Sequence, residues 1–309
     1  MVLGGGIKME SFFGHIFTGF TVTLAATAMT WTLLTKWHRS RFDPNSPPFL
    51  CTIRCFPWRR PWEAYLVAMA ALLIVLQSTV KGMGEHWWFF KMENAEHTCI
   101  LAGFIIVALT VICTEHKFHL PPHSDHAALI LALVARWLFL ADHWHDAPPG
   151  VMLMHRLQKN VVAAGILALV IEIFTKSQVS SGLFRSYCLF LQGTWLCQLG
   201  YAIYSPWEND WDLASDQHLP VITVVFIAHL FFGFLITMGL NCLVIKLQEV
   251  EYRRKSYILD ALKVQSEKVP LINGENQVIK KDFMSLAVVL GLCFFLIAYR
   301  ALVALKVLQ

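Results

Sequence analysis

The feature that most constrains this chain is a series of long apolar blocks, each about as long as a membrane is thick. Eight blocks can be delimited, roughly residues 12–35, 62–80, 97–114, 126–141, 153–174, 183–204, 220–245 and 283–307. A helix needs about 20 mainly apolar residues to cross the hydrocarbon core of a bilayer. The blocks therefore predict an all-α fold, a polytopic membrane helix bundle with seven spans and an eighth hydrophobic helix at the carboxyl end.

Composition favours the same class. Hydrophobic residues make up 56% of the 309 residues and charged residues 15%, against about 45–50% and about 25% in soluble domains. In hydrocarbon each span must satisfy its own backbone hydrogen bonds, and the short alternating segments of a membrane β-barrel are absent, so helices are expected. The lipid bilayer is the expected partner, and we expect no nucleic-acid binding.

Basic residues are concentrated in alternate connections between the blocks, which predicts the orientation. The first, third, fifth and seventh connections hold most of the Lys and Arg residues, whereas the even-numbered ones hold only Lys81 and Lys91. Short loops rich in Lys and Arg remain in the cytoplasm. We therefore expect the amino terminus to lie outside the cell or in a lumen, and the odd-numbered connections to lie in the cytosol.

The same pattern divides the chain into three regions. Residues 1–246 are the predicted seven-helix membrane domain, residues 247–282 a basic cytosolic connection, and residues 283–309 an additional hydrophobic helix. The beginning of the connection, residues 249–266, is compatible with a polar continuation of the seventh helix. Cys51 and Cys55 lie in the first basic loop and are interpreted as free thiols, with palmitoylation as the alternative.

Ionisable residues within the spans carry the main functional signal, because they are costly in a membrane. Many of them fall in the predicted outer half, including six histidines: His15, His97, His143, His145, His155 and His229. Neutral imidazole is the commonest metal ligand, and three or four converging histidines with a carboxylate would suit zinc. We predict a shared metal site with Glu96 or Asp142 as base or supporting group. The alternative is a structural hydrogen-bond network.

The turn between the fourth and fifth blocks relates several of these residues in depth. Two prolines and a glycine mark the turn at residues 148–150, and residues equally distant from it lie at equal depth on antiparallel helices. His143 then pairs in depth with His155, and Asp142 with Arg156. We therefore predict that His143 and His155 share a ligand and that Asp142 and Arg156 form an ion pair.

Two further groups of polar residues are notable. Gln192 and Thr194 in the sixth block cannot share one helix face. Together with Gln198 they predict structural polar contacts and a central position for this helix. The third connection carries several acids and histidines that are interpreted as a solvated loop broken by prolines, with a metal site as the alternative: Glu115, His116, His119, His123, Asp125 and His126.

Several short motifs occur in order along the chain. They are Gly14-His15, Glu96-His97, His143-Trp144-His145 followed by Pro148-Pro149 and His155, Leu191-Gln192-Gly193-Thr194-Trp195 with Gln198 and Gly200, and His229. In these motifs the chain resembles the transmembrane protein 45 family, which includes the transmembrane epididymal proteins, over about residues 10–250. The resemblance implies a multi-pass protein, usually with seven spans, in the plasma membrane or in secretory and endolysosomal membranes. Its members have no assigned activity and end in a charged tail, from which the block at 283–307 departs.

Three functions follow from the histidine pattern, and the sequence leaves open whether the protein is an enzyme. The first is a membrane protein with a histidine-lined metal site and no chemistry of its own. The second is an intramembrane metal-dependent lipid hydrolase, in which a metal held by His143, His155 and His229 activates water. The third is a proton- or metal-coupled transporter with the histidines as relay, although no inverted repeat is evident.

Overall fold

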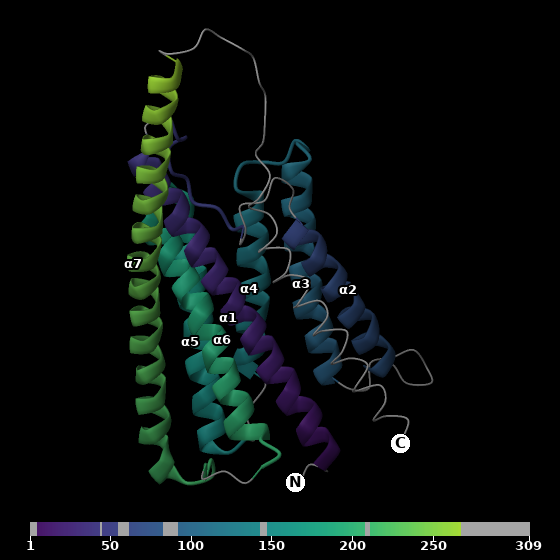
Figure 1. Cartoon of the computed structure of the whole chain (residues 1–309). Helices are drawn as coiled ribbons and strands as arrows, with labels where there is room; N and C mark the ends of the chain where they lie inside the picture. Colours follow the sequence, from purple (N-terminus) through teal and green to yellow (C-terminus); the bar gives the residue numbers. More distant parts are fainter. Residues whose placement is uncertain are drawn as a thin grey trace.

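The computed structural model describes residues 5–43, 45–54, 62–82, 92–142, 147–207 and 211–266. Every regular element in this part of the chain is helical, so the predicted all-α class is confirmed (Figure 1). The elements are α1 (Gly5–Phe42), α2 (Trp62–Gly82), α3 (Met92–Glu115), α4 (Ser124–Asp142), α5 (Pro149–Phe174), α6 (Val179–Tyr204), the short 3-10 helix η1 (Asp216–His218) and α7 (Leu219–Ser266).

Five stretches within the described residues are long and apolar enough to cross a membrane: Phe12–Phe42, Thr98–Glu115, Ser124–Ala141, Pro149–Phe174 and Asp216–Leu262. A shorter apolar stretch, Trp62–Leu76, lies in α2. The protein is therefore an integral membrane helix bundle. The predicted count of seven or eight spans and the division into three regions stay predictions, and residues 283–307 lie outside the described part.

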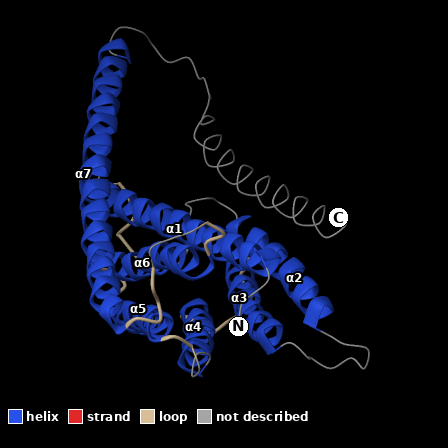
Figure 2. Ribbon diagram, turned by 90° about the horizontal axis from the view of Figure 1, so that it is seen from below, coloured by secondary structure: helices blue, strands red, loops and turns tan. Residues whose placement is uncertain are grey.

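The helices form one antiparallel bundle in which α6 is central. α6 packs along α1 and also contacts α5 and α7, whereas α2 packs on α3 and α3 on α4. Seen from below, α7 and α2 lie at opposite sides of the bundle (Figure 2). α7 also continues well past the ends of its neighbours (Figure 1), which confirms the predicted helical continuation to Ser266.

The contact between α1 and α6 is close enough to require glycine. A Cβ atom placed on Gly193 would lie 2.6 Å from the backbone nitrogen of Thr23, and one on Gly19 would lie 2.6 Å from the carbonyl oxygen of Gly193. In membranes, where lipid is as apolar as the side chains, such close backbone packing is what joins helices. Next to this contact, the fully buried Trp195 donates its Nε1–H to the carbonyl oxygen of Met154 on α5 at 3.0 Å.

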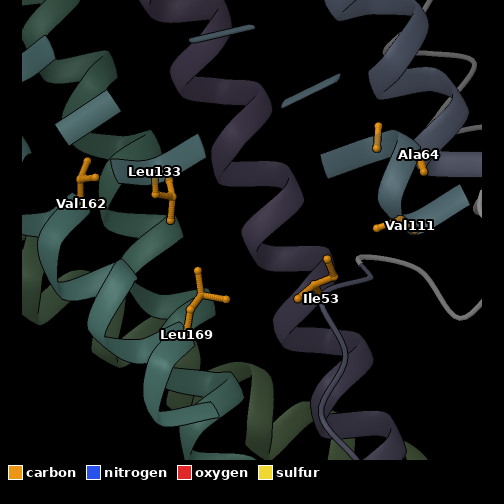
Figure 3. Close-up of a cluster of buried hydrophobic side chains, with 7 residues drawn as sticks. Ile53, Ala64, Val111, Leu133, Val162 and Leu169 are labelled. Carbon is orange, nitrogen blue, oxygen red and sulfur yellow. The ribbon is translucent and has the colours of Figure 1, made fainter. Parts of the chain in front are cut away.

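Apolar clusters hold the remaining helices together. One joins α2, α3, α4, α5 and the segment after α1 (Figure 3), and consists of Ile53, Ala64, Ala108, Val111, Leu133, Val162 and Leu169. A second joins α5, α6 and α7 through Met154, Trp195, Leu199, Ala202 and Ile222. The two clusters share α5, which is thereby packed against both halves of the bundle. Together α5 and α6 carry most of the buried polar residues.

Candidate functional site

Three of the predicted histidines have described side chains, and each lies on a different helix. His15 of α1 lies beside Tyr204 at the end of α6, with ring centroids 4.7 Å apart. His229 of α7 lies edge-on to the indole of Trp195, with ring centroids 5.5 Å apart. Both rings are therefore packed against aromatic side chains of α6.

His155 is bonded within its own helix. Its Nδ1 lies 2.9 Å from the carbonyl oxygen of Val151 and donates to it, and the residue is 6% exposed. Within the described ranges, no group of three or more His, Cys, Asp or Glu residues is placed to hold a metal. These residues thus give no support to the predicted zinc site.

The other members of that predicted site lie outside the described part. His143 and His145 belong to residues 143–146, and the side chains of Glu96, His97 and Asp142 are also outside it. Arg156, the predicted ion-pair partner of Asp142, is exposed. The depth pairing across the turn therefore stays a prediction.

A groove on the bundle brings together three residues that the sequence analysis names, Thr194, Gln198 and His229. We call it the intramembrane groove. It has a volume of about 450 Å³ and is bounded by α1, α6 and α7, and its lining consists of Ile16, Phe20, Thr23, Thr194, Cys197, Gln198, Tyr201 and His229. The lining residues of α1 and α7 belong to stretches that are long and apolar enough to cross a membrane.

The groove follows from the angle between α1 and α7. The two helices meet near the end of α1, where His38 Nε2 lies 2.9 Å from Asn241 Oδ1 and the rings of Phe42 and Tyr252 are 6.5 Å apart. Toward the opposite end of the bundle, α1 slants away from α7 (Figure 1). The surface of α6 then forms the floor between two diverging walls.

The lining is apolar with a few neutral polar groups. Of the described residues that line the groove, none is Asp, Glu, Lys or Arg. The hydroxyls of Thr23 and Thr194 donate to carbonyls of their own helices at 2.8 and 3.4 Å, and the Cys197 thiol donates to the α1 backbone at 3.6 Å. The amide of Gln198 and the ring of His229 are thus the polar groups best suited to a ligand.

A buried ionic cluster, which the sequence analysis missed, lies near the other end of α5 and α6. Glu172 is 0% and Arg185 4% exposed. Arg185 Nε donates to Glu172 Oε2 at 2.5 Å, and Nη2 lies 3.3 Å from Oε1. His126, 1% exposed, places Nε2 3.3 Å from Glu172 Oε1 and Nδ1 2.9 Å from Asp125 Oδ1. The interpretation of this histidine as part of a solvated loop is therefore wrong.

The cluster joins five parts of the chain. Besides the carboxylate, Arg185 Nη2 donates to the carbonyl oxygen of Thr52 at 2.8 Å, and Nη1 contacts Met29 of α1. It thereby ties α1, α4, α5 and α6 to the segment that follows α1. Each charge has several partners, as a buried charge requires, and we interpret the cluster as a structural clamp.

A signal for this clamp was present in the sequence. Glu172 is the one acidic residue in the fifth apolar block, and Arg185 is the one basic residue in the sixth. The two flank a short turn, so antiparallel helices bring them to the same depth. The same face of α5 and α6 continues seven residues further with Gly165 and Gln192, where a Cβ on the glycine would lie 3.4 Å from the amide nitrogen.

Comparison with protein families gives a match over part of the chain. Residues 123–242 match the profile of a family described as "Family of unknown function (DUF716)". The matched segment covers α4, α5, α6 and about half of α7, and so contains the ionic residues Asp125, His126, Glu172 and Arg185 and the floor and one wall of the intramembrane groove. Transmembrane protein 45 proteins belong to that family, and the narrower assignment stays a prediction. Over α4 to α7, this chain is similar to the DUF716 family.

Proposed function

We propose that this integral membrane protein binds a neutral lipid that carries a hydroxyl group, in the intramembrane groove, and performs no chemistry on it. The groove is the observation that carries the proposal. Its volume of about 450 Å³ lies within the roughly 300–1,000 Å³ of small-molecule sites. Its walls are spanning helices, so a ligand would enter sideways from the bilayer.

The lining supports a neutral ligand. An ionised headgroup would lose its hydration in the groove without meeting an opposite charge, which is costly. A hydroxyl both donates and accepts, and so can bond the Oε1 and Nε2 atoms of Gln198 or a ring nitrogen of His229. Apolar side chains such as Ile16 and Phe20 would contact the hydrocarbon part of the lipid.

The other predicted activities have less support. A metal-dependent hydrolase and a metal-coupled transporter both require histidines that converge, and His15, His155 and His229 have separate neighbours. Lipid binding requires no metal and uses Thr194, Gln198 and His229 where they lie. Like the first sequence hypothesis, it assigns the protein a non-catalytic role.

The proposed orientation keeps the amino terminus outside the cell or in a lumen. It is supported by the basic residues at the end of the bundle where α1 ends and α7 continues, among them Lys36, Arg39 and Lys246. Positive charge in short loops favours the cytosolic side. The intramembrane groove would then lie in the outer half of the bilayer.

Photocrosslinking tests the proposal. The full chain in phosphatidylcholine nanodiscs would be labelled with a photoreactive sterol, a photoreactive diacylglycerol or a photoreactive phosphatidylcholine, and the labelled peptides identified by mass spectrometry. We expect one of the two neutral probes to label peptides of α1, α6 and α7 that line the groove. Unlabelled ligand of the same kind should compete.

A pair of variants makes the test specific. Replacing Gln198 and His229 by leucine should reduce groove labelling about tenfold, because each lost hydrogen bond is worth about 0.5–1.5 kcal/mol. The matched control is Thr110→Leu, also a change from polar to apolar, at a half-buried position on α3 away from the groove. Labelling spread over all lipid-facing helices, equal labelling by phosphatidylcholine, or unchanged labelling of Q198L/H229L would each contradict the proposal.

A further inference from the structure

The membrane boundary can be located at the end of the bundle where α1 ends. α1 has no charged residue between Ser11 and Lys36, and α7 has none from its start to Lys246. At the same level, Arg41 lies over the ring of Trp37, 5.0 Å from its centroid. Aromatic and basic residues gather where a helix leaves the hydrocarbon. Lys36 and Lys246 therefore mark the headgroup layer of this leaflet.

A second groove lies just beyond this boundary, between the end of α1 and the continuation of α7. We call it the boundary groove. It has a volume of about 280 Å³, and its polar lining includes Arg39, Asn45, Gln248, Lys255 and Ser256. Two cations, two carboxylates and several neutral hydrogen-bonding groups thus surround one small hollow. It lies on the water side of the residues that mark the headgroup layer, where a headgroup phosphate that projects from the membrane can reach it.

We propose that the boundary groove binds the headgroup of an anionic phospholipid that carries a terminal phosphate. Arginine binds phosphate oxygens through paired hydrogen bonds, and lysine binds them as a point charge. The groove offers one of each, Arg39 from α1 and Lys255 from α7. A bound headgroup would therefore link the two helices at the membrane surface.

Two acidic residues share the groove, and their positions are compatible with the proposal. Asp43 accepts a hydrogen bond from the backbone nitrogen of Asn45 at 3.0 Å. Glu251 lies 3.3 Å from Lys255 Nζ in a pair whose side chains are 31% and 51% exposed. Exposed pairs of this kind contribute little, so the lysine can turn to a phosphate at small cost.

The surroundings add positive charge. Arg41, Lys246, Arg253 and Arg254 are exposed on other faces of the same stretches of α1 and α7. Each Lys or Arg near an anionic membrane surface adds to the attraction, which falls off within a Debye length. Because the hollow combines fixed donors with this general attraction, a headgroup with a terminal phosphate fits better than phosphatidylserine. The site is separate from the intramembrane groove and takes a ligand of opposite character.

Native mass spectrometry of the full chain in detergent tests the proposal by counting bound lipids. The chain would be incubated with phosphatidylcholine, phosphatidylserine or a phosphatidylinositol phosphate. We expect preferential retention of the phosphatidylinositol phosphate, and about a tenfold loss of this retention in Arg39→Gln/Lys255→Gln. The matched control is Lys117→Gln/Lys176→Gln, which removes the same charge from loops at the same end of the bundle.

Three results would overturn the proposal. They are equal loss of retention in the two double variants, equal retention of phosphatidylserine by the wild-type chain, and no preference over phosphatidylcholine. If R39Q/K255Q folds poorly, K255Q alone gives the same test, because Lys255 is an exposed residue of α7. The failure of this proposal would leave neutral-lipid binding in the intramembrane groove untouched.

Discussion

Replacing Glu172 by leucine removes the centre of the buried ionic cluster. Arg185 would keep the carbonyl of Thr52 as a partner, but its charge would be buried without a carboxylate. Breaking a buried pair by removing one partner costs about 3–5 kcal/mol. For a chain of this size, the thermal midpoint should fall by roughly 10 °C. The matched control is Glu249→Leu on exposed α7, which should change stability by less than about 0.5 kcal/mol.

The double variant Glu172→Leu/Arg185→Leu distinguishes a clamp from a general loss of packing. With both charges removed, the interior is left without an unpaired ion, and such replacements are often neutral or stabilising. We therefore expect the double variant to recover most of the stability lost in E172L. Thermal unfolding of the purified protein in one detergent, followed by intrinsic fluorescence, compares the wild type, E172L, Arg185→Leu and the double variant. Wild-type stability in E172L, or a double variant less stable than the single, would refute the clamp.

Three other predictions concern the packing and the buried polar groups. Gly193→Ala should lower the folded yield in size-exclusion chromatography, because its methyl group would meet the backbone of Thr23, whereas Gly239→Ala has open space and should be tolerated. Both amide atoms of Gln158 are buried without a hydrogen-bond partner in the described residues, so Gln158→Leu should raise the free energy of unfolding by about 1 kcal/mol; a decrease would indicate bound water. Burial raises the pKa of the Cys51 thiol above its ordinary 9.0. Iodoacetamide should therefore alkylate this thiol of the folded chain slowly near pH 8, and the stability that the protonated thiol contributes should be lost as pH rises above 9. Rapid alkylation at pH 8 would contradict the burial of Cys51.

The helices could be predicted from the sequence because apolar length alone defines them. The block at residues 220–245 and the polar stretch after it correspond to α7, which runs without a break to Ser266. The block at 12–35 ends earlier than α1, which continues to Phe42. The last turns of α1 contain Lys36, Arg39 and Arg41. These charged residues are helical, but a block defined by hydrophobicity ends before them.

The sites were harder to predict, because depth in the membrane says nothing of the direction in which a side chain points. His155 and His229 were expected to converge, yet one bonds its own helix and the other packs on Trp195. His126 was missed for the converse reason. It lies in the first turn of α4, next to polar loop residues, and the packing of α4 on the end of α5 buries it against Glu172.

The contact between α1 and α6 can form only late in the synthesis of the chain. α1 leaves the ribosome long before its main partner, since Thr30 meets Ser186, 156 positions further along the chain, at 3.0 Å. During that interval α1 must remain in lipid without α6. Four of its threonine hydroxyls have partners within α1 itself, because those of Thr21, Thr23, Thr27 and Thr30 donate to carbonyls four residues earlier at 2.8–2.9 Å. α1 can therefore remain inserted in the bilayer with these hydroxyls hydrogen-bonded. Its close glycine contacts form only after α6 has been inserted and packs against it.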